Sequence, residues 1–194
     1  METKELNEKV VQMFKAMSLV LESTKHGFLT QNPKTLTEAE TNLSRIITSN
    51  LPFTEEVVKK STKNEAEKKF INVLPHLQLM AVNIRNLINE NKKRIESNLP
   101  FTDKAIHEIE DLLTLMETQF QDTADYVLTA NPHLKMHIRT VMENLLKRAE
   151  ECVAGHETRL ITGVCMPKAS YLYLAIVNSI RGVSSELTNF SEKL

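Results

Sequence analysis

The sequence has few of the residues that turn a chain. Its 194 residues include only four glycines and six prolines, with seven Phe, three Tyr and no Trp. An all-β sandwich needs many tight turns, and this composition supplies too few residues for them. Leu, Lys, Glu and Met instead favour helices, and 41% hydrophobic residues are enough to bury a core. We therefore expect an all-α protein.

An excess of charge of one sign is also lacking. The chain has 24 Lys and Arg residues against 25 Asp and Glu residues, for a formal net charge of −1. Nucleic acids and anionic membrane surfaces attract proteins through clustered positive charge. We therefore expect no nucleic-acid partner, and membrane association only through another protein.

No long apolar run is present. The longest, Tyr171 to Val177, is far shorter than the roughly 20 residues that span a bilayer. The charged start of the chain lacks the apolar stretch of a secretory signal, so we expect a cytoplasmic protein. Cys152 and Cys165 fit no C-x-x-C pattern, and we interpret both as reduced thiols.

Apolar residues recur every three or four positions, which predicts long amphipathic helices. We expect six helices, over residues 3–31, 34–49 with a continuation near 54–62, 64–96, 102–130, 133–162 and 167–193. Nearly the same sequence occurs at Ser49 to Thr54 and Ser97 to Thr102, and we expect both copies to break a helix. Pro75 should kink the third helix. The basic run Lys92 to Arg94 is interpreted as a solvated helix end.

The chain also contains an internal repeat. Shifted by 99 positions, Val10 falls on Ile109 and Met17 on Met116, and the two Asn-Pro pairs at Asn32 and Asn131 coincide. Near the ends of the two halves the offset becomes 103. We predict two homologous halves, 1–98 and 99–194, each an antiparallel three-helix bundle, packed together as one compact unit.

These features together resemble the PhoU family of phosphate-uptake regulators over the whole chain. The resemblance rests on the duplicated architecture, the Asn-Pro breaks, the segment Arg159-Leu160-x-x-Gly163-x-Cys165-x-Pro167, and the apolar segment Tyr173 to Asn189. It implies a cytoplasmic helical protein tied to inorganic phosphate transport or its signalling. Because no catalytic or cofactor-binding constellation is evident in this sequence, we expect a non-enzymatic regulator without cofactor. The implied partner is a phosphate transporter or sensor kinase component.

The resemblance also locates the family's metal site, an acidic residue followed four positions later by Asp in each repeat. Counted back from Asn86 and Asn189, those positions hold Gln78 and Val82 in the first half and Arg181 and Ser185 in the second. None of these side chains is acidic, so we expect a divergent member without metal clusters. We expect the face around Arg181 and Ser185 to contact the partner.

Two pairs of residues with helical spacing are candidate sites. His133 and His137 share a helix face, but no acidic residue follows at position 141, so we expect no metal there. Cys152 and His156 have the same spacing, but no third group that would orient a nucleophile is evident. We therefore expect no catalytic residue.

Two other classes of function remain as alternatives. A metal-binding or storage bundle would need a Glu-x-x-His motif, which is absent, and a hydrolase would need a nucleophile constellation. The sequence leaves open the partner's identity, whether the chain forms a homodimer, and whether phosphate binds directly.

Overall fold

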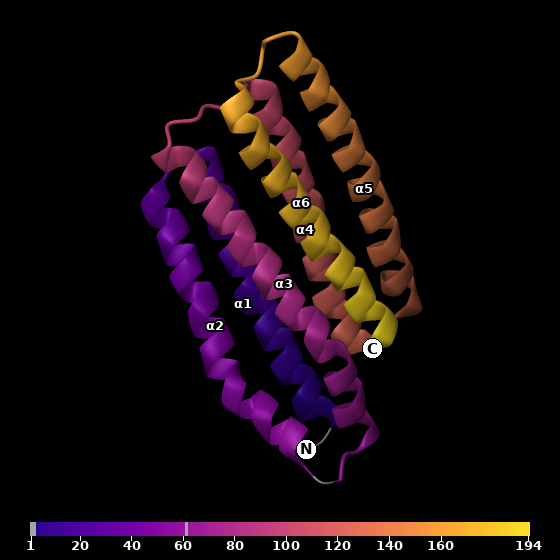
Figure 1. The fold of residues 1–194 in the computed structure, drawn as a ribbon. Helices are drawn as coiled ribbons and strands as arrows, with labels where there is room; N and C mark the ends of the chain where they lie inside the picture. The colour runs from indigo at the N-terminus through magenta and orange to yellow at the C-terminus, as the bar shows by residue number, and fades with distance from the viewer. Residues whose placement is uncertain (1–2, 61) are drawn as a thin grey trace.

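The computed structural model describes residues 3–60 and 62–194, and in these residues the chain is helical without any strand. Consecutive helices run in opposite directions along an elongated bundle (Figure 1). The all-α expectation is confirmed. The six helices of the described residues are α1 (Thr3–Leu29), α2 (Pro33–Lys59), α3 (Glu65–Glu96), α4 (Asp103–Thr129), α5 (Pro132–Ile161) and α6 (Pro167–Lys193).

The Asn-Pro pairs start α2 and α5 as predicted. The Asn32 side chain accepts hydrogen bonds from the backbone N–H groups of residues 34 and 35, and the Asn131 side chain accepts one from residue 133. The residue before each Asn is left-handed, with φ of 52° at Gln31 and 50° at Ala130. This conformation ends the preceding helix, and the Asn cap then begins the next one.

The starts of α3 and α4 and the end of α5 also have identifiable causes. Thr102 caps α4 by accepting a hydrogen bond from the Ala105 N–H. Asn64 and Glu67 form a reciprocal capping box at the start of α3. Gly163, with φ of 72°, follows the end of α5, where glycine has no Cβ to strain the left-handed backbone.

The predicted break in the second helix is wrong. α2 continues through Ser49–Thr54 with Pro52 inside it, although Pro52 has no N–H to donate to the Thr48 carbonyl. Beyond the proline, the Phe53 ring packs edge-on against Phe70 at 5.3 Å, and Val57 is fully buried. Full burial of Val57 contributes about 1.5–3 kcal/mol, and the half-buried Phe53 adds to it, which offsets much of the roughly 3 kcal/mol cost of a helical proline.

The copy at Ser97–Thr102 does end a helix. Ser97 is the C-cap of α3, and Asn98 is left-handed with φ of 50°. The same residue types therefore give opposite outcomes at the two places. α3 itself runs on through Pro75 as one helix.

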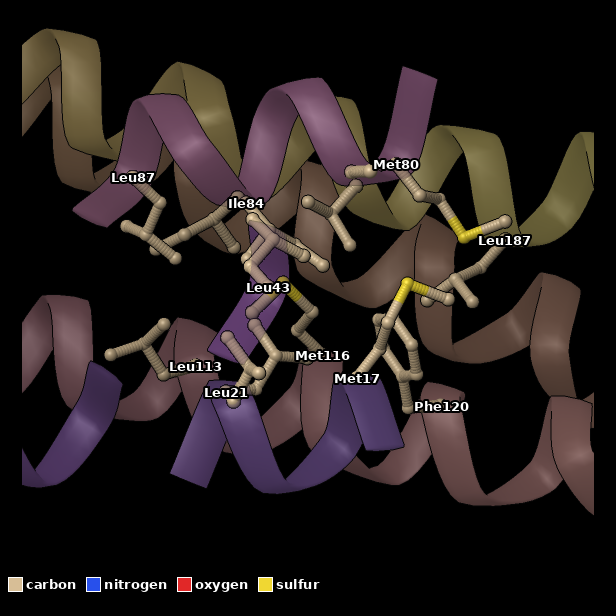
Figure 2. Packing of buried hydrophobic residues seen from close by; sticks show 14 of the residues in the cluster. Met17, Leu21, Leu43, Met80, Ile84, Leu87, Leu113, Met116, Phe120 and Leu187 are labelled. Carbon is tan, nitrogen blue, oxygen red and sulfur yellow. The ribbon is translucent and has the colours of Figure 1, made fainter. Parts of the chain in front are cut away.

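One hydrophobic core joins all six helices, and Figure 2 shows part of it, including Met17, Met80, Met116 and Leu187. The repeat residues Val10, Met17, Ile109 and Met116 all belong to this core. The Phe14 ring of α1 packs against the rings of Phe120 of α4 and Phe190 of α6, with ring centroids 5.6 Å and 5.0 Å apart. The core is therefore continuous between the first three helices and the last three.

Contacts between the helices follow a simple order. Within the first three helices α2 packs on α1 and α3, and within the last three α5 packs on α4 and α6. Between these groups, α3 packs along α6 and α1 along α4. Gly182 lets α6 approach α3 closely, because a Cβ atom there would lie 2.7 Å from the side chain of Asn83. Within the described residues, no helix has the combination of length and apolarity that spanning a membrane requires.

Candidate functional site

Helix α2 is buried at its two ends but not in its middle. Its fully buried residues are Leu36, Ala39, Leu43 and Val57, and none of the residues between Leu43 and Val57 is buried. By contrast, α5 has buried residues at intervals of three or four along its length: Ile138, Val141, Leu145, Ala149, Cys152 and His156. The first half of the molecule therefore has a packing gap that the second half lacks.

This gap forms a groove of about 250 Å³, which we call the α2–α3 groove. Helix α1 contributes Met13 and Met17 to its lining, and the other lining side chains come from α2 and α3. They are Ile46, Ile47, Asn50, Leu51 and Thr54 of α2, and Leu74, Leu77, Gln78, Ala81, Val82 and Arg85 of α3. The groove is thus a mainly apolar site beside three helices.

The polar groups of the groove are few. Arg85 is the one charged residue of its lining, is half-buried, and makes no hydrogen bond or ion pair with the described residues. The Asn50 side chain donates to the backbone carbonyl of Ile46 at 2.8 Å. Leu51 and Val82 are each 48% exposed. These residues therefore offer a ligand an apolar surface and one cation, Arg85, that has no ion-pair partner among the described residues.

The four positions at which the PhoU family would carry acids fall in two different environments. Gln78 and Val82 are exposed on α3 and both line the α2–α3 groove. Arg181 and Ser185 are half-buried on α6 and are not among the residues that line it. The structure thus brings each pair together on one helix face, but places only the first pair at the groove.

Of the two histidines at the start of α5, His137 has a carboxylate partner. Both side chains are exposed, and His137 Nδ1 lies 2.8 Å from Asp122 Oδ2 on α4. Among the described residues, no group of three or more His, Cys, Asp or Glu side chains is placed to hold a metal ion.

Cys152 and His156 lie in a polar cluster that the sequence did not reveal. The Arg159 guanidinium donates to both carboxylate oxygens of Glu108, at 2.8 Å and 2.6 Å, and the Tyr173 hydroxyl donates to the same carboxylate at 2.6 Å. His156 stacks on Tyr173 with ring centroids 4.5 Å apart. The partners of Glu108 are distant in sequence, so helical spacing gives no signal for them.

The electrostatics of this cluster favour neutral or fully paired groups. Burial raises the pKa of the Cys152 thiol, and burial together with the Glu108 hydrogen bond raises the pKa of Tyr173. The pKa of His156 is lowered by burial and by the charge of Arg159. A neutral thiol is a poor nucleophile, so this arrangement serves the structure better than it serves catalysis.

The same cluster builds the corner of the Arg159–Pro167 segment. The Arg159 carbonyl accepts hydrogen bonds from the N–H groups of Val164 and Cys165, at 2.9 Å and 3.1 Å. Its side chain meanwhile holds Glu108 of α4. Arg159 thus fixes the turn between α5 and α6 onto α4.

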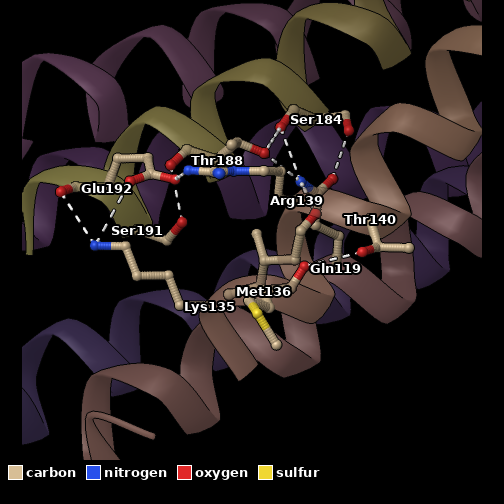
Figure 3. A network of polar contacts seen from close by, with 10 residues as sticks. Gln119, Lys135, Met136, Arg139, Thr140, Ser184, Thr188, Ser191 and Glu192 are labelled. Carbon is tan, nitrogen blue, oxygen red and sulfur yellow. Dashed lines mark hydrogen bonds and ion pairs between the residues drawn. The ribbon is translucent and has the colours of Figure 1, made fainter. Parts of the chain in front are cut away.

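A second buried polar network connects α4 with α6 (Figure 3). The Gln119 amide donates to the Ser184 carbonyl at 3.0 Å and to the Thr188 hydroxyl at 2.9 Å, and it accepts from the Ser184 hydroxyl at 2.5 Å. On the nearby surface Lys135 and Arg139 pair with Glu192. Because Gln119 is fully satisfied, it joins α4 to α6 and has no free group for a ligand.

The interpretation of Lys92 to Arg94 as a solvated helix end is wrong for Arg94. This side chain is buried, and its Nη2 donates to the Phe28 carbonyl at 2.9 Å. Its guanidinium lies 4.7 Å from the centre of the Phe28 ring and 4.9 Å from that of Phe101. Burial lowers its pKa. Arg94 therefore binds the end of α1 to α3.

Comparison with known proteins matches the chain to no family model and to no curated protein. The assignment of a function therefore depends on the residues and geometry described above.

Proposed function

We propose that the chain is a PhoU-like, non-enzymatic regulator of inorganic phosphate transport or its signalling. In this proposal the molecule consists of two tandem antiparallel three-helix bundles, 1–98 and 99–194. The observation that carries the proposal is that corresponding helices of the two halves pack on each other, α1 on α4 and α3 on α6. A duplicated three-helix unit with a twofold relation between its copies accounts for that pairing.

Local geometry supports the duplication. The left-handed residues Gln31 and Ala130 occupy corresponding positions, and each precedes an Asn that caps the next helix. Corresponding core residues Phe14 and Leu113 are both buried. The same stop and start signals thus recur in three dimensions at the offset that the sequence predicted.

The proposed activity is the binding of another protein. Its support is that Glu108, Arg159 and Tyr173, which form the largely buried charged cluster, are bonded to one another and join helices. Arg181 is half-buried on α6 and makes no ion pair with the described residues, so its charge is available to an acidic partner surface. We place the docking face around Arg181 and Ser185, with a transporter or sensor kinase component as the partner.

Affinity capture from the membrane fraction of phosphate-starved native cells tests this function. We expect the wild-type chain to retrieve a phosphate-transporter or sensor-kinase component. Arg181→Glu should retrieve less of it, whereas Lys147→Glu, the same charge reversal on an exposed position of α5, should retrieve as much as wild type. A wild-type chain that retrieves neither component would overturn the proposal, and equal capture by Arg181→Glu would show that the docking face is elsewhere.

A further inference from the structure

The α2–α3 groove exposes apolar side chains where a simple repeat would bury them. In the second half, the helix of the same rank is buried at regular intervals from Ile138 to His156. In the first half, Ile46, Ile47 and Leu51 of α2 are only half-buried or exposed. Leaving apolar surface in water is unfavourable, so an occupant that covers it would gain free energy from burial.

The dimensions of the groove limit what can enter it. On α3 its lining extends from Leu74 to Arg85, which is about 16 Å at 1.5 Å per residue. Its volume of about 250 Å³ is below the range of about 300–1,000 Å³ for typical small-molecule sites. An α-helix with its side chains is about 10–12 Å across. The groove therefore suits a narrow unbranched chain better than a whole helix.

The floor of the groove is adaptable. Met13 is half-buried and Met17 is buried, and both belong to α1. Methionine has an unbranched and polarizable side chain that fills irregular spaces. These two residues can therefore follow the contour of a flexible apolar chain.

The charge of Arg85 indicates which head group a ligand of the groove would carry. Arg85 is the last lining residue along α3, and its guanidinium has no ion-pair partner among the described residues. A guanidinium binds a carboxylate through two parallel hydrogen bonds. Because the lining contains a single cation, a head group with one negative charge matches it better than a doubly charged phosphate ester.

We infer that the α2–α3 groove binds a single-chain carboxylate amphiphile, with its alkyl chain over Met13 and Met17 and its carboxylate on Arg85. This site is independent of the proposed phosphate-related function, since it lies in the first half and the docking residues lie on α6. Binding of an amphiphile and capture of a transporter component can therefore fail separately.

NMR of the methionine methyl groups with sodium decanoate, kept below its micelle concentration, tests the site on the full chain. Saturable shifts are expected at Met13 and Met17 and not at Met136, which is 64% exposed on α5. Decyltrimethylammonium, with the same chain and a positive head, and butyrate, with a short chain, should both bind more weakly.

Two variants separate a true site from general detergent action. Arg85→Gln should weaken decanoate binding about tenfold, the effect of losing one charge-assisted pair. Gln78→Glu places a negative charge at an exposed position of the groove and should also weaken it, whereas Gln121→Glu, exposed on α4, should not.

Four results would overturn the inference. The first is the absence of a saturable shift at Met13 and Met17, and the second is an equal shift at Met136. The third is a shift at Met13 and Met17 that depends on protein concentration without decanoate, because a second copy of the chain would then be the occupant. Retained affinity in Arg85→Gln, with the fold intact by circular dichroism, would remove the carboxylate assignment.

Discussion

The Arg159 guanidinium and the Glu108 carboxylate form a two-bond ion pair, at 2.8 Å and 2.6 Å, that joins the end of α5 to α4. Both side chains are largely buried, and Tyr173 donates a third hydrogen bond to the same carboxylate. The corner before α6 therefore depends on a charge pair inside the protein.

Removing one partner of this pair should be costly. Glu108→Gln leaves the Arg159 charge uncompensated, and we expect the free energy of unfolding to fall by about 3 kcal/mol. Urea denaturation measures it. The double variant Glu108→Leu with Arg159→Met should recover most of the loss, because a buried pair can be replaced by apolar side chains. A loss below about 0.5 kcal/mol for Glu108→Gln would contradict this account of the corner.

Stability in acid should depend on Glu67. Hydrogen bonds from Lys60 and from the Asn64 N–H lower the pKa of Glu67 from 4.5 to about 2. A pKa that is lower in the folded state gives stability above pH 4.5, which is lost as the pH falls toward 2. Glu67→Gln should therefore make the unfolding free energy less steep between these pH values. Identical slopes for the two proteins would show that Glu67 is not responsible.

Pro52 should limit the stability of α2. Pro52→Ala restores a backbone donor to the Thr48 carbonyl within a continuous helix. We therefore expect the free energy of unfolding to rise by about 1 kcal/mol or more. Thermal unfolding followed by circular dichroism measures the change. A lower melting temperature for Pro52→Ala would mean that α2 needs the local distortion of the proline.

Gly182 should be required for the close approach of α6 to α3. A Cβ atom at this position would meet the Asn83 side chain at 2.7 Å, so Gly182→Ala should destabilise the protein by about 1 kcal/mol. In an Asn83→Ala background the clash is absent, and the same change should be neutral or stabilising. Equal effects in the two backgrounds would rule out this contact as the cause.

The sequence predicted the helices well because their end signals are local. Asn32 and Asn131 act on backbone groups two or three residues away, and Thr102 acts on Ala105. The predicted break at Ser49–Thr54 is wrong because the contact of Phe53 with Phe70 of α3 and the burial of Val57 decide the outcome. Local patterns describe caps but not this tertiary contribution.

The site was less predictable than the fold. Glu108 meets Arg159 and Tyr173 across 51 and 65 residues, and no spacing rule connects positions so far apart. The α2–α3 groove lies where the middle of α2 has no buried residue, which its apolar periodicity does not reveal. Only the placement of Gln78 and Val82 on one helix face followed from the sequence.

The initial rate of inorganic phosphate uptake by native cells tests the proposed function most directly. Cells that lack the chain should take up phosphate at an altered rate, and the wild-type chain or Lys147→Glu should restore it. Arg181→Glu, present at the same level, should not restore it. An uptake rate that does not change when the chain is removed, in both phosphate-rich and phosphate-poor medium, would contradict the proposal that this protein regulates phosphate transport.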